Sequence, residues 1–395
     1  MELFLFKLGK IWKTLRQEGL ARGGKRVWNY VSIYFSHVLK YNLKGDVLIV
    51  GTGVGDVGHF RVFTQAEEFN LHGIKTAVTL QDNPFLLKLA DKFKVFVLVR
   101  PVYTPKMEAF WKKLKELKKT VIFDTDDLVF DAKFMHATES YRRMNALEKK
   151  QYEKGVGEEI INDPALEFCS TTTTYLKKIL ESYGKKVFLN QNKISLHELE
   201  VAEKINSQHP KSQKRSTVRI GYFSGTMSHN KDFATIVPAL LKVMEKYPQV
   251  ELILVGALEI GNELNRFASR IRKIGLAPRD KHYENLSQVD INLIPLVKDD
   301  PFNKSKSELK FFEAGIVKTP SVAVNDETYR GCIFDGGDGF LASTIEEWFE
   351  KLEKLVLDPE LRLSMGQKAY EKSLEDYTVK NSHNEEYYNF LKSKI

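Results

Sequence analysis

The feature that most constrains this chain is a regular alternation of short apolar runs with segments of helical periodicity. In the first half, strand-like runs occur at 46–50, 76–80, 95–99, 120–123 and 168–171, and helical segments occur at 60–72, 106–119 and 173–182. Strands that alternate with helices return to the same sheet in parallel, with helices on both faces. The first half therefore predicts an α/β domain built on a parallel sheet.

The alternation stops at 204–216 (KINSQHPKSQKRS), a polar, turn-rich segment without apolar periodicity that we interpret as a linker. It then restarts, with strands expected at 218–224, 250–256, 289–295 and 321–324 and helices at 232–246, 262–274 and 307–315. The sequence thus predicts an α/β fold with two Rossmann-like, doubly wound domains, at 46–203 and 217–370. A basic segment, 1–45, precedes them, and a helical tail, 371–395, follows, of the kind that crosses back to the first domain in many two-domain enzymes.

Length and cysteine content narrow the class of protein. A chain of 395 residues is long enough for about two to three domains. Its two cysteines, Cys169 and Cys332, lie far apart without metal-ligand neighbours, so neither a disulfide framework nor a zinc site is expected. No apolar run reaches the roughly 18 residues that span a bilayer, and Lys7 and Lys10 interrupt the N-terminal apolar stretch. We therefore expect a cytoplasmic protein.

Most of the net charge of +8 is concentrated near the N-terminus, where residues 1–45 hold nine Lys and Arg against two Glu. In a helix over residues 1–20, Phe4, Leu8, Ile11, Trp12 and Leu15 would share one face and Lys7, Lys10, Lys13 and Arg16 the other. This pattern suits peripheral contact with an anionic membrane, on its cytoplasmic face. A helix that packs on the protein's own domain explains the pattern equally well. Nucleic acid is not an expected partner, because interleaved stacking residues and recognition motifs are missing.

A glycine-rich loop follows the first strand, in the stretch GTGVGDVGHFR (51–61). Gly53, Gly55 and Gly58 satisfy the spacing G-x-G-x-x-G of dinucleotide-binding proteins, and Asp82 is the acid about 20 residues further on. A nicotinamide-dependent oxidoreductase is therefore one alternative. The additional Gly51, the immediately following Arg61 and the second complete domain favour a different use of the loop, in which glycines let the backbone line a binding cleft.

A candidate anion site opens the second domain, in SGTMSHNKDF (224–233). Small residues after a strand let the backbone approach a ligand. A phosphate could bind here through three kinds of group: the N–H groups at the start of the helix, the hydroxyls of Ser224 and Thr226, and the ammonium of Lys231. Helix capping by Ser228 or Asn230 would explain only part of this set.

Two more stretches carry charged side chains at expected strand ends or helix starts. In NKSKSELKFFEAGIVKTP (303–320), Lys310 and Glu313 lie three residues apart on one helix face. The lysine could reach a phosphate and the carboxylate a ribose; a surface ion pair is the alternative.

In FDTDDL (123–128), Asp126 and Asp127 lie at the end of a strand. Carboxylates at this place suit a general base, a sugar-binding site or a divalent-metal site, although helix or turn capping is as good an explanation.

Together these stretches resemble the glycosyltransferase group 1 family of the GT-B fold, in which two Rossmann-like domains face a cleft. KFFEAGIVKTPSVA is similar to the family segment K-x-x-E-x-x-A-x-G-x-P-V, with Lys310, Glu313 and Pro320 in register. SGTMSHNKDF resembles the element that holds the donor diphosphate, FDTDDL an acidic turn of the first domain in bacterial polysaccharide-type members, and HFRVFTQAEEF the family's first helix.

The resemblance implies transfer of a sugar from a nucleotide diphosphate donor to a hydroxyl acceptor, either a glycan or a lipid-linked intermediate, with retention of configuration. No cofactor and no metal are implied. The donor side would comprise Ser224, Gly225, Thr226, His229, Lys231, Lys306, Lys310 and Glu313. The acceptor side would comprise Gly53, Gly55, Gly58, Arg61, Asp126 and Asp127. The catalytic residues would be Lys231, Glu313, Asp126 and Asp127, with the base that removes the acceptor proton unassigned and His229 one candidate.

Three positions depart from the family pattern. Ser305 stands where the family has the first glutamate of its E-x7-E motif, Lys318 replaces the glycine before the proline, and no arginine partners Lys231. The departure at Ser305 leaves a non-catalytic assembly protein of the GT-B class as a further alternative.

Overall fold

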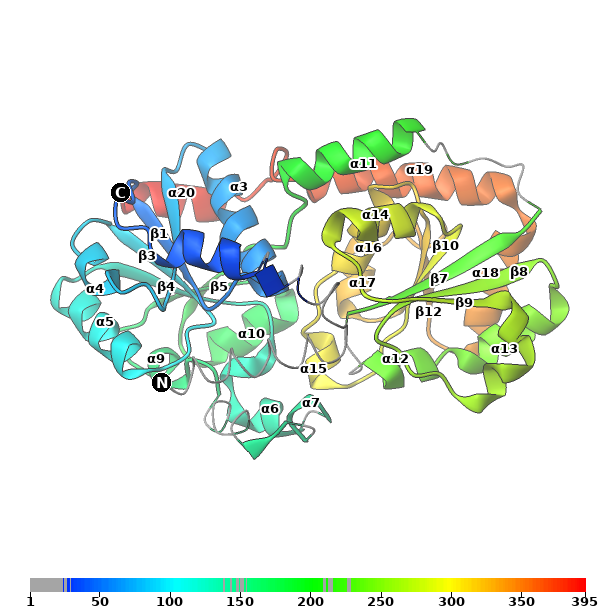
Figure 1. The fold of residues 1–395 in the computed structure, drawn as a ribbon, viewed down its shortest axis with the longest axis horizontal. Helices are drawn as coiled ribbons and strands as arrows, with labels where there is room; N and C mark the ends of the chain where they lie inside the picture. Colours follow the sequence, from blue (N-terminus) through cyan, green and yellow to red (C-terminus); the bar gives the residue numbers. More distant parts are fainter. Residues whose placement is uncertain are drawn as a thin grey trace. The chain divides into compact units, whose positions relative to one another are not determined.

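The computed structural model describes residues 24, 27–28, 30–137, 139–142, 144–146, 149, 153, 155–208, 211, 216–225 and 229–395. The chain divides into two compact units, one formed by Met1–Asn192 with Asn384–Ile395 and the other by Lys193–His383. Each unit contains a six-stranded sheet whose neighbouring strands are all parallel (Figure 1). The prediction of two doubly wound α/β domains is thus confirmed.

The sheet of the first unit has the strand order β2-β1-β3-β4-β5-β6. Its strands are β1 (Val47–Gly51), β2 (Thr76–Leu80), β3 (Val95–Val99), β4 (Thr120–Thr125), β5 (Phe168–Thr171) and β6 (Lys186–Leu189). Every residue of β1 and β3 is buried, as expected for apolar strands covered on both faces. The strand order reverses direction between β1 and β3, so the loops after these two strands flank the switch point where open α/β sheets bind ligands.

The helices of the first unit follow the sequence pattern closely. The π-helical segment η1 (His59–Thr64) continues directly into α3 (Gln65–Leu71), and Gly73 follows with φ +79°. Thr104 caps α5 (Pro105–Glu116), and Thr173 caps α10 (Thr174–Ser182). The remaining segments are α2 (Asp56–Gly58), α4 (Leu86–Leu89), η2 (Leu128–Phe130), α6 (Ala132–Ala137), α7 (Glu139–Arg142), α9 (Glu158–Ile161) and α20 (Glu385–Ser393).

The sheet of the second unit has the order β12-β11-β10-β7-β8-β9. Its strands are β7 (Val218–Ser224), β8 (Val250–Gly256), β9 (Ile271–Ile274), β10 (Ile291–Ile294), β11 (Ser321–Val324) and β12 (Phe340–Ala342). Here the chain order reverses between β7 and β10, which pair through Ile291 with Ile220 and Leu293 with Tyr222. The carboxyl ends of β7 and β10 therefore define the switch point of this unit.

Helices of the second unit surround this sheet (Figure 1). They are α11 (Leu196–Gln208), α12 (Asn230–Ala234), α13 (Val237–Lys246), the 3-10 segment η4 (Asn262–Arg270), α14 (Arg279–Ser287), α15 (Pro301–Lys304), α16 (Leu309–Gly315), α17 (Glu327–Cys332), α18 (Ile345–Leu357) and α19 (Pro359–Asp376). Asp300 caps α15 and Asp358 caps α19, each followed by a proline at the start of the helix.

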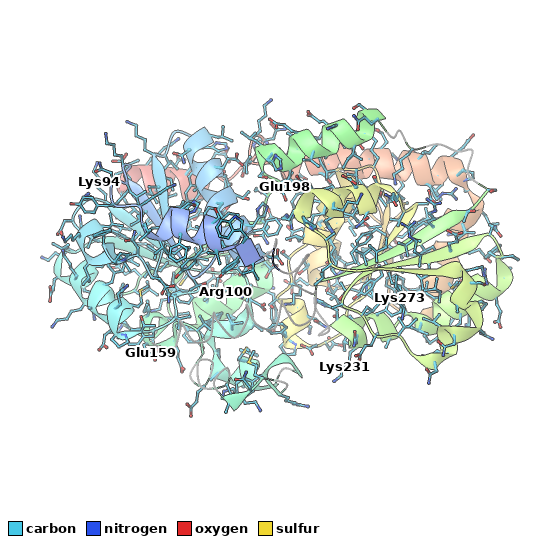
Figure 2. All side chains as sticks on the ribbon, in the orientation of Figure 1. Lys94, Arg100, Glu159, Glu198, Lys231 and Lys273 are labelled. Carbon is cyan, nitrogen blue, oxygen red and sulfur yellow. The ribbon has the colours of Figure 1, made fainter. Side chains whose placement is uncertain are left out.

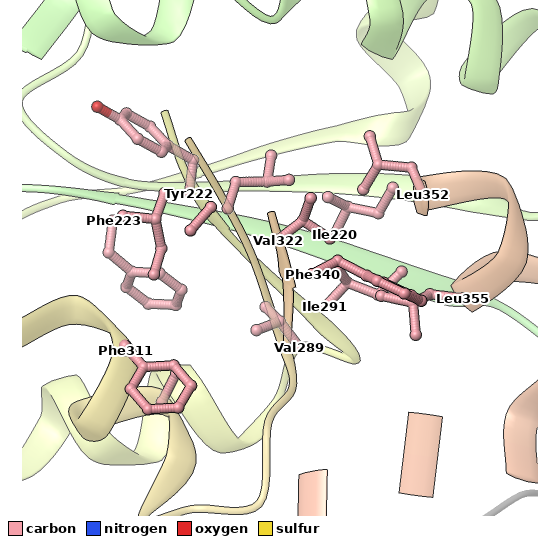
Figure 3. Close-up of a cluster of buried hydrophobic side chains, with 14 of the residues drawn as sticks. Ile220, Tyr222, Phe223, Val289, Ile291, Phe311, Val322, Phe340, Leu352 and Leu355 are labelled. Carbon is pink, nitrogen blue, oxygen red and sulfur yellow. The ribbon is translucent and has the colours of Figure 1, made fainter. Parts of the chain in front are cut away.

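The hydrophobic core of the second unit is organised around β7. Figure 3 shows Tyr222 and Phe223 leaving this strand in opposite directions, because successive strand residues face opposite sides of a sheet. Tyr222 lies on the side of Phe233, with a ring-centroid distance of 4.9 Å. Phe223 lies on the side of Phe311, a fully buried residue of α16. The core thus fixes α12 and α16 beside the carboxyl end of β7.

The C-terminal helix α20 packs in the first unit. Tyr387 lies 5.4 Å from Phe69 and 4.9 Å from Phe188, measured between ring centroids, and the Tyr388 hydroxyl donates to Glu68 at 2.6 Å. The tail therefore returns to the first unit, in the way expected of such a C-terminal segment.

The helix expected at 262–274 is wrong in its second half. The segment is 3-10 helical only to Arg270, and Ile271–Ile274 forms β9, which pairs with β8 at the sheet edge. Ile271 and Ile274 are spaced as in a helix, but pairing with β8 satisfies the backbone of both strands. Sheet formation, a non-local interaction, overrides the local pattern here.

The expected linker at 204–216 does not connect the two units. Its first residues complete α11, whose Glu198, Ala202 and Ile205 are buried at helical spacing. Lys211 is fastened within the second unit, since its ammonium donates to the carbonyls of Ser287 and Val289. The chain passes between the units instead at Asn192–Lys193 and at His383–Asn384. The segments next to these two passages are paired. Ile194 forms an isolated parallel bridge with Thr378, and the Ile194 N–H donates to the Tyr377 carbonyl at 2.7 Å.

The amphipathic helix expected over residues 1–20 lies outside the described residues. Among the residues that are described, no helix is long and apolar enough to cross a membrane.

Candidate functional site

Loops from the two central strands of the second sheet meet at its switch point. Residues 225–233 follow β7, and residues 295–313 follow β10 and carry α15 and α16. Gly256, at the end of β8, has φ +101°, and a Cβ there would lie 1.7 Å from the Ser224 carbonyl oxygen. A glycine is therefore required for β8 to end so close to the start of the first loop. We call this region, comprising residues 222–233, 279–283 and 297–313, the β7–β10 site.

The Lys310 ammonium is the most unusual group of the β7–β10 site. Its Nζ is buried and makes no hydrogen bond to any residue that the structure describes. It lies 4.9 Å from the centroid of the Tyr222 ring, which supplies a weak cation–π contact. Burial lowers the pKa of Lys310 to about 8, although Asp232 and Glu313 act in the opposite direction. A buried ammonium without an acceptor is costly in an empty site and is well suited to an anionic ligand.

Asp232 joins the two loops of the β7–β10 site. One carboxylate oxygen accepts from the Val297 N–H and from the Asn303 amide, both at 2.8 Å, and the other lies 2.8 Å from His229 Nδ1. The Asp232 side chain is buried and belongs to α12, whereas Val297 lies in the loop after β10 and Asn303 in α15, which this loop leads into. This carboxylate therefore fixes the loop that leads to Lys306 and Lys310 against α12.

His229 lies between these acidic and basic groups. Burial is the main cause that lowers the pKa of His229, and the charges of Lys310 and Lys306 lower it further, against the opposing effect of Asp232. The neutral imidazole is therefore favoured, a form that can accept a proton or donate from one ring nitrogen.

Glu313, three residues after Lys310, is buried and bound on both carboxylate oxygens. Oε1 accepts from the Arg279 guanidinium at 2.5 Å, and Oε2 lies 3.3 Å from His282 Nε2. Burial acts to raise the pKa of Glu313, but Arg279 and His282 hold it below its usual range. Arg279 also donates to Glu198 at 2.6 Å. The carboxylate is thus ionised and held in one position by α14.

The predicted donor residues before α12 are less enclosed. The side chain of Ser224 is buried and its hydroxyl lies 3.3 Å from the Ala257 carbonyl, while Gly225 is exposed. Lys231, in the first turn of α12, is exposed, and Figure 2 labels it at the surface of the second unit. Thr226 lies outside the described residues. The structure thus places Lys306 and Lys310, rather than Lys231, where their charges act on His229.

Ser305, which replaces the glutamate of the family pattern, has a structural role. It is fully buried, and its hydroxyl donates to the Phe302 carbonyl at 2.7 Å, in the last turn of α15. The next residue, Lys306, places its Nζ 4.0 Å from the centroid of the Phe302 ring. The position of the glutamate is therefore occupied by a small residue that closes a helix turn and brings a lysine next to it.

The glycine loop of the first unit is shaped by contacts within the loop. A Cβ at Gly58 would lie 2.2 Å from the Gly53 carbonyl oxygen, so Gly58 has to be a glycine for the loop to fold onto α2. Gly55 precedes α2 and has open space around its Cα, and Gly53 lies beside the hydroxyl of Tyr30. Asp82, the acid that a nicotinamide enzyme would need, accepts a hydrogen bond from Tyr34.

Arg61 does not face a ligand, contrary to the prediction of an acceptor contact. Its side chain is 1% exposed and forms a bidentate ion pair with Asp124, with distances of 3.0 and 2.5 Å. The remaining guanidinium nitrogen donates to the Asn190 carbonyl at 2.7 Å. The π-helical turn of η1 directs this arginine inward, where it links the first helix to β4 and to the end of β6. The arginine is therefore a structural residue of the first unit.

Asp126 and Asp127 share one cationic partner, Arg100. Asp126 lies 2.6 Å from the Arg100 guanidinium and Asp127 lies 3.3 Å from it. Asp127 also caps η2 through the Leu128 N–H, as the capping alternative predicts. Arg100 directly follows β3 and has φ +42°, an uncommon conformation for a residue other than glycine. The acidic turn and Arg100 therefore form one charged cluster at the switch point of the first sheet.

Several residues of these sites were not identified from the sequence. Asp232, Arg279 and His282 of the β7–β10 site, and Arg100 of the first unit, lie in segments without a distinctive spacing. Asp232 and Arg100 could have been found from one signal, a charged residue directly after a strand or in the first turn of the following helix. Nothing in the local sequence indicates that Arg279 contacts Glu313, 34 positions away. Among the described residues, no group of three His, Cys, Asp or Glu side chains could hold a metal ion.

Comparisons with known proteins agree with this arrangement. Residues 204–372 match the family described as glycosyl transferases group 1. The chain is 24% identical over 318 residues to the trehalose synthases of Thermococcus litoralis and Pyrococcus furiosus, with 72% of this chain and 75% of each relative covered.

Solved structures of glycosyltransferases share the fold. Anabaena Alr3699/HepE in complex with UDP superposes with a TM-score of 0.58 at 13% identity, covering 89% of this chain and 100% of that one. A glycosyltransferase from Rickettsia africae gives 0.58 at 15% identity, with 90% and 100% covered. Sucrose-phosphate synthase from Thermosynechococcus elongatus gives 0.55 at 12% identity, with 88% and 97% covered. The two six-stranded parallel sheets are thus those of the GT-B fold.

Proposed function

We propose that this chain, whose residues 204–372 match the family described as glycosyl transferases group 1, transfers a sugar from a nucleotide diphosphate donor to a hydroxyl acceptor. The observation that carries this proposal is the buried Lys310 ammonium, which has no hydrogen-bond acceptor among the described residues. Structures with the same fold were obtained in complex with UDP and with UDP-glucose, which supports a nucleotide sugar as donor. A nicotinamide oxidoreductase is not favoured, because residues 204–372 match the family described as glycosyl transferases group 1.

In this proposal the donor diphosphate binds at the β7–β10 site. Lys310 provides an enclosed positive charge and Lys306 a second charge beside it, while Ser224 provides a hydroxyl, Gly225 a backbone amide and Lys231 an exposed ammonium. Negative charge increases on the diphosphate as the bond to the sugar breaks. Fixed cations therefore stabilise the transition state more than the ground state and lower the barrier. This account requires no metal ion and no further cofactor.

Glu313 is proposed to bind the nucleotide ribose. Each of its oxygens already contacts one donor, but a carboxylate oxygen has a second lone-pair direction that can accept a sugar hydroxyl. Arg279 and His282 keep the carboxylate ionised and oriented, which strengthens a hydrogen bond from ribose. Lys310 and Glu313 would thus bind adjacent parts of one nucleotide from a single face of α16.

The acceptor is proposed to contact the first unit at the glycine loop and at the cluster of Arg100, Asp126 and Asp127. Asp126 is partly exposed, with 16% of its side chain accessible, and can reach an acceptor hydroxyl. His229, whose neutral ring is favoured, stays a candidate for the general base of the reaction. The family resemblance supports retention of the anomeric configuration.

Residues 1–20 are proposed to attach the protein to the cytoplasmic face of an anionic membrane, on the basis of their charge and amphipathic pattern. Removal of these residues should weaken sedimentation with vesicles that contain phosphatidylglycerol while the melting temperature stays the same. Equal binding after the deletion would contradict this role.

The sugar-transfer proposal can be tested by measuring donor hydrolysis and thermal shifts with a panel of UDP-, GDP- and ADP-sugars. Stabilisation by at least one of these donors, lost in Lys310→Met and Glu313→Gln, is the expected result. Lys273→Met serves as a matched control, because Lys273 is an exposed lysine of β9 in the same unit (Figure 2). Stabilisation by NAD(P) alone, or donor binding that survives both substitutions, would overturn the assignment. Donor binding without any turnover would instead support the non-catalytic alternative.

A further inference from the structure

The first described helix of the chain, 30–38, is fixed to the first unit by one face. The Tyr34 hydroxyl donates to Asp82, and the Tyr34 ring stacks on Tyr30 at 6.2 Å between centroids. His37 meets the ring of Phe63 edge-on at 4.7 Å, and Val38 is buried. This face places the helix, drawn in dark blue in Figure 1, firmly on the folded domain.

Four large apolar side chains in and beside this helix are open to solvent. The exposed fractions are 72% for Trp28, 51% for Phe35, 59% for Leu39 and 46% for Tyr41. Trp28, Phe35 and Leu39 are spaced by seven and four residues and therefore form one stripe along a helix. We call these four residues the N-terminal apolar face. Large apolar side chains gathered in this way on a surface are typical of an interaction site.

The segment that carries the N-terminal apolar face is rich in positively charged residues. Residues 21–45 contain five Lys and Arg and no acidic residue. Lys92 is exposed, and its Nζ lies 4.1 Å from the centroid of the Tyr41 ring and donates to the Tyr41 carbonyl. Lys88, four residues earlier, is also exposed and follows the exposed Leu87. Nearby Asp91 is paired with Lys113 at 2.5 Å. The rim of the apolar face is therefore cationic.

We propose that the N-terminal apolar face inserts into the headgroup region of an anionic membrane, with the surrounding lysines at the lipid phosphates. Aromatic side chains favour this interfacial region, and each Lys or Arg near an anionic surface adds to the attraction. A second copy of the chain is a poorer occupant, because a two-fold contact would bring the two cationic rims together. The contact belongs to the folded unit and is independent of the segment 1–20.

This contact has a consequence for the acceptor. Tyr30 lies on the inner face of the same helix, and a Cβ at Gly53 would lie 3.4 Å from its hydroxyl. The helix is thus attached to the glycine loop at the carboxyl edge of the first sheet, where the acceptor is proposed to bind. Lipid contact through the outer face keeps this edge at the membrane surface, which favours a lipid-linked acceptor. This last step rests on the proposed sugar transfer, whereas the lipid contact does not.

Sedimentation with vesicles tests the contact in the full chain. The variant Trp28→Ser/Phe35→Ser/Leu39→Ser should bind vesicles of phosphatidylcholine with phosphatidylglycerol at least tenfold more weakly than the unmodified protein, because three interfacial side chains are lost. The matched control is Phe334→Ser/Leu357→Ser, since Phe334 and Leu357 are 72% and 59% exposed in the second unit. The control should bind like the unmodified protein. Equal binding by the triple variant, or loss of self-association instead of vesicle binding, would overturn the proposal.

Tryptophan quenching provides a direct readout of insertion. Trp111 and Trp348 are buried, at 3% and 5% exposed, so a Trp12→Phe variant retains Trp28 as the exposed tryptophan. Brominated phosphatidylglycerol vesicles should quench its fluorescence, and this quenching should disappear in Trp12→Phe/Trp28→Phe. Unquenched Trp28 in vesicle-bound protein would overturn the proposal.

The same samples separate this inference from the proposed function. Thermal shifts with UDP, GDP and ADP should be equal for the triple variant and the unmodified protein, because the stripe lies outside the donor unit. If no nucleotide binds either protein while vesicle binding responds as expected, the proposed transfer fails and the lipid contact stands.

Discussion

Arg279 lies 2.5 Å from Glu313 and 2.6 Å from Glu198, and so joins three helices of the second unit. Glu198 belongs to the first turn of α11, where it also accepts from the Ser195 N–H and hydroxyl in a capping box. The start of α11 lies only a few residues after the passage between the units. The carboxylate proposed to bind ribose is therefore positioned by an arginine that is itself held at the beginning of this unit.

Substitution of Arg279 should weaken donor binding more than it slows the chemical step. Arg279→Gln leaves Glu313 buried with only His282 as a partner, and loss of one member of a buried charged pair costs about 2–5 kcal/mol. We expect the donor KM to rise at least tenfold with a smaller change in kcat, and partial recovery in Arg279→Lys. Arg219→Gln is a suitable control, because Arg219 pairs with Glu251 at 3.6 Å near the surface. An unchanged KM would contradict the positioning role.

The activity should decrease at high pH because of Lys310. Its pKa in the ligand-free protein is about 8, so the ammonium is lost as the pH rises through this value. The pH profile of kcat/KM reports groups of the free enzyme, and we therefore expect it to fall above about pH 8. In Lys310→Arg, the guanidinium stays charged, and this limb should move to higher pH. If kcat/KM fell at the same pH in both proteins, the decrease would belong to a group other than Lys310.

Removal of the same charge should stabilise the ligand-free protein. The folded-state pKa of Lys310, about 8, lies below the ordinary value of 10.5, so the ammonium destabilises the fold below pH 8 and this effect disappears as the pH rises to 10.5. Lys310→Met should therefore raise stability at pH 7 by about 3.5 kcal/mol at most, given about 1.4 kcal/mol for each unit of pKa.

Thermal unfolding at several pH values checks this prediction. A gain of several degrees in Tm is expected at pH 7, with a smaller gain at pH 10. A lower Tm of Lys310→Met at pH 7 would show that Lys310 contributes to stability and would remove the argument that its burial serves a ligand.

Metal removal should leave sugar transfer intact. The proposed mechanism places lysine side chains, not a divalent cation, against the diphosphate. Transfer rates measured after treatment with EDTA, with and without added Mg²⁺ or Mn²⁺, should agree within a factor of two. A loss of activity that Mg²⁺ or Mn²⁺ restores would contradict the mechanism.

Disruption of the Arg61–Asp124 pair should affect folding and not ligand binding. Both side chains are essentially inaccessible, and Ser170 also donates to Asp124 at 2.6 Å. Arg61→Met leaves a buried carboxylate without its counter-ion, and such a loss costs about 3–5 kcal/mol. Denaturant unfolding should show this destabilisation, while the thermal shift caused by the donor nucleotide is retained. A stable variant with an altered acceptor KM would restore the role in acceptor binding.

The fold could be predicted in large part from the sequence because it depends on local patterns. The buried runs of β1, β3 and β7 alternate with amphipathic helices, and each prediction needs only a window of about ten residues. The incorrect predictions of secondary structure occur where a contact with a residue far away in the sequence determines the local conformation. Ile271 and Ile274 form an edge strand because β8 lies beside them, and the start of the expected linker is helical because Ala202 and Ile205 pack inward.

For the site, reading along the chain identifies which charged and small residues follow the strands, and it predicts an anionic ligand at the switch point of the second unit. Only the tertiary structure decided which of these groups are enclosed. Arg61 and Lys310 look equally functional in the sequence, but the arginine is neutralised by Asp124, whereas the lysine is buried without an acceptor. The physical reason is that a charge acquires its role from the groups packed around it, and those groups come from segments far away in the chain.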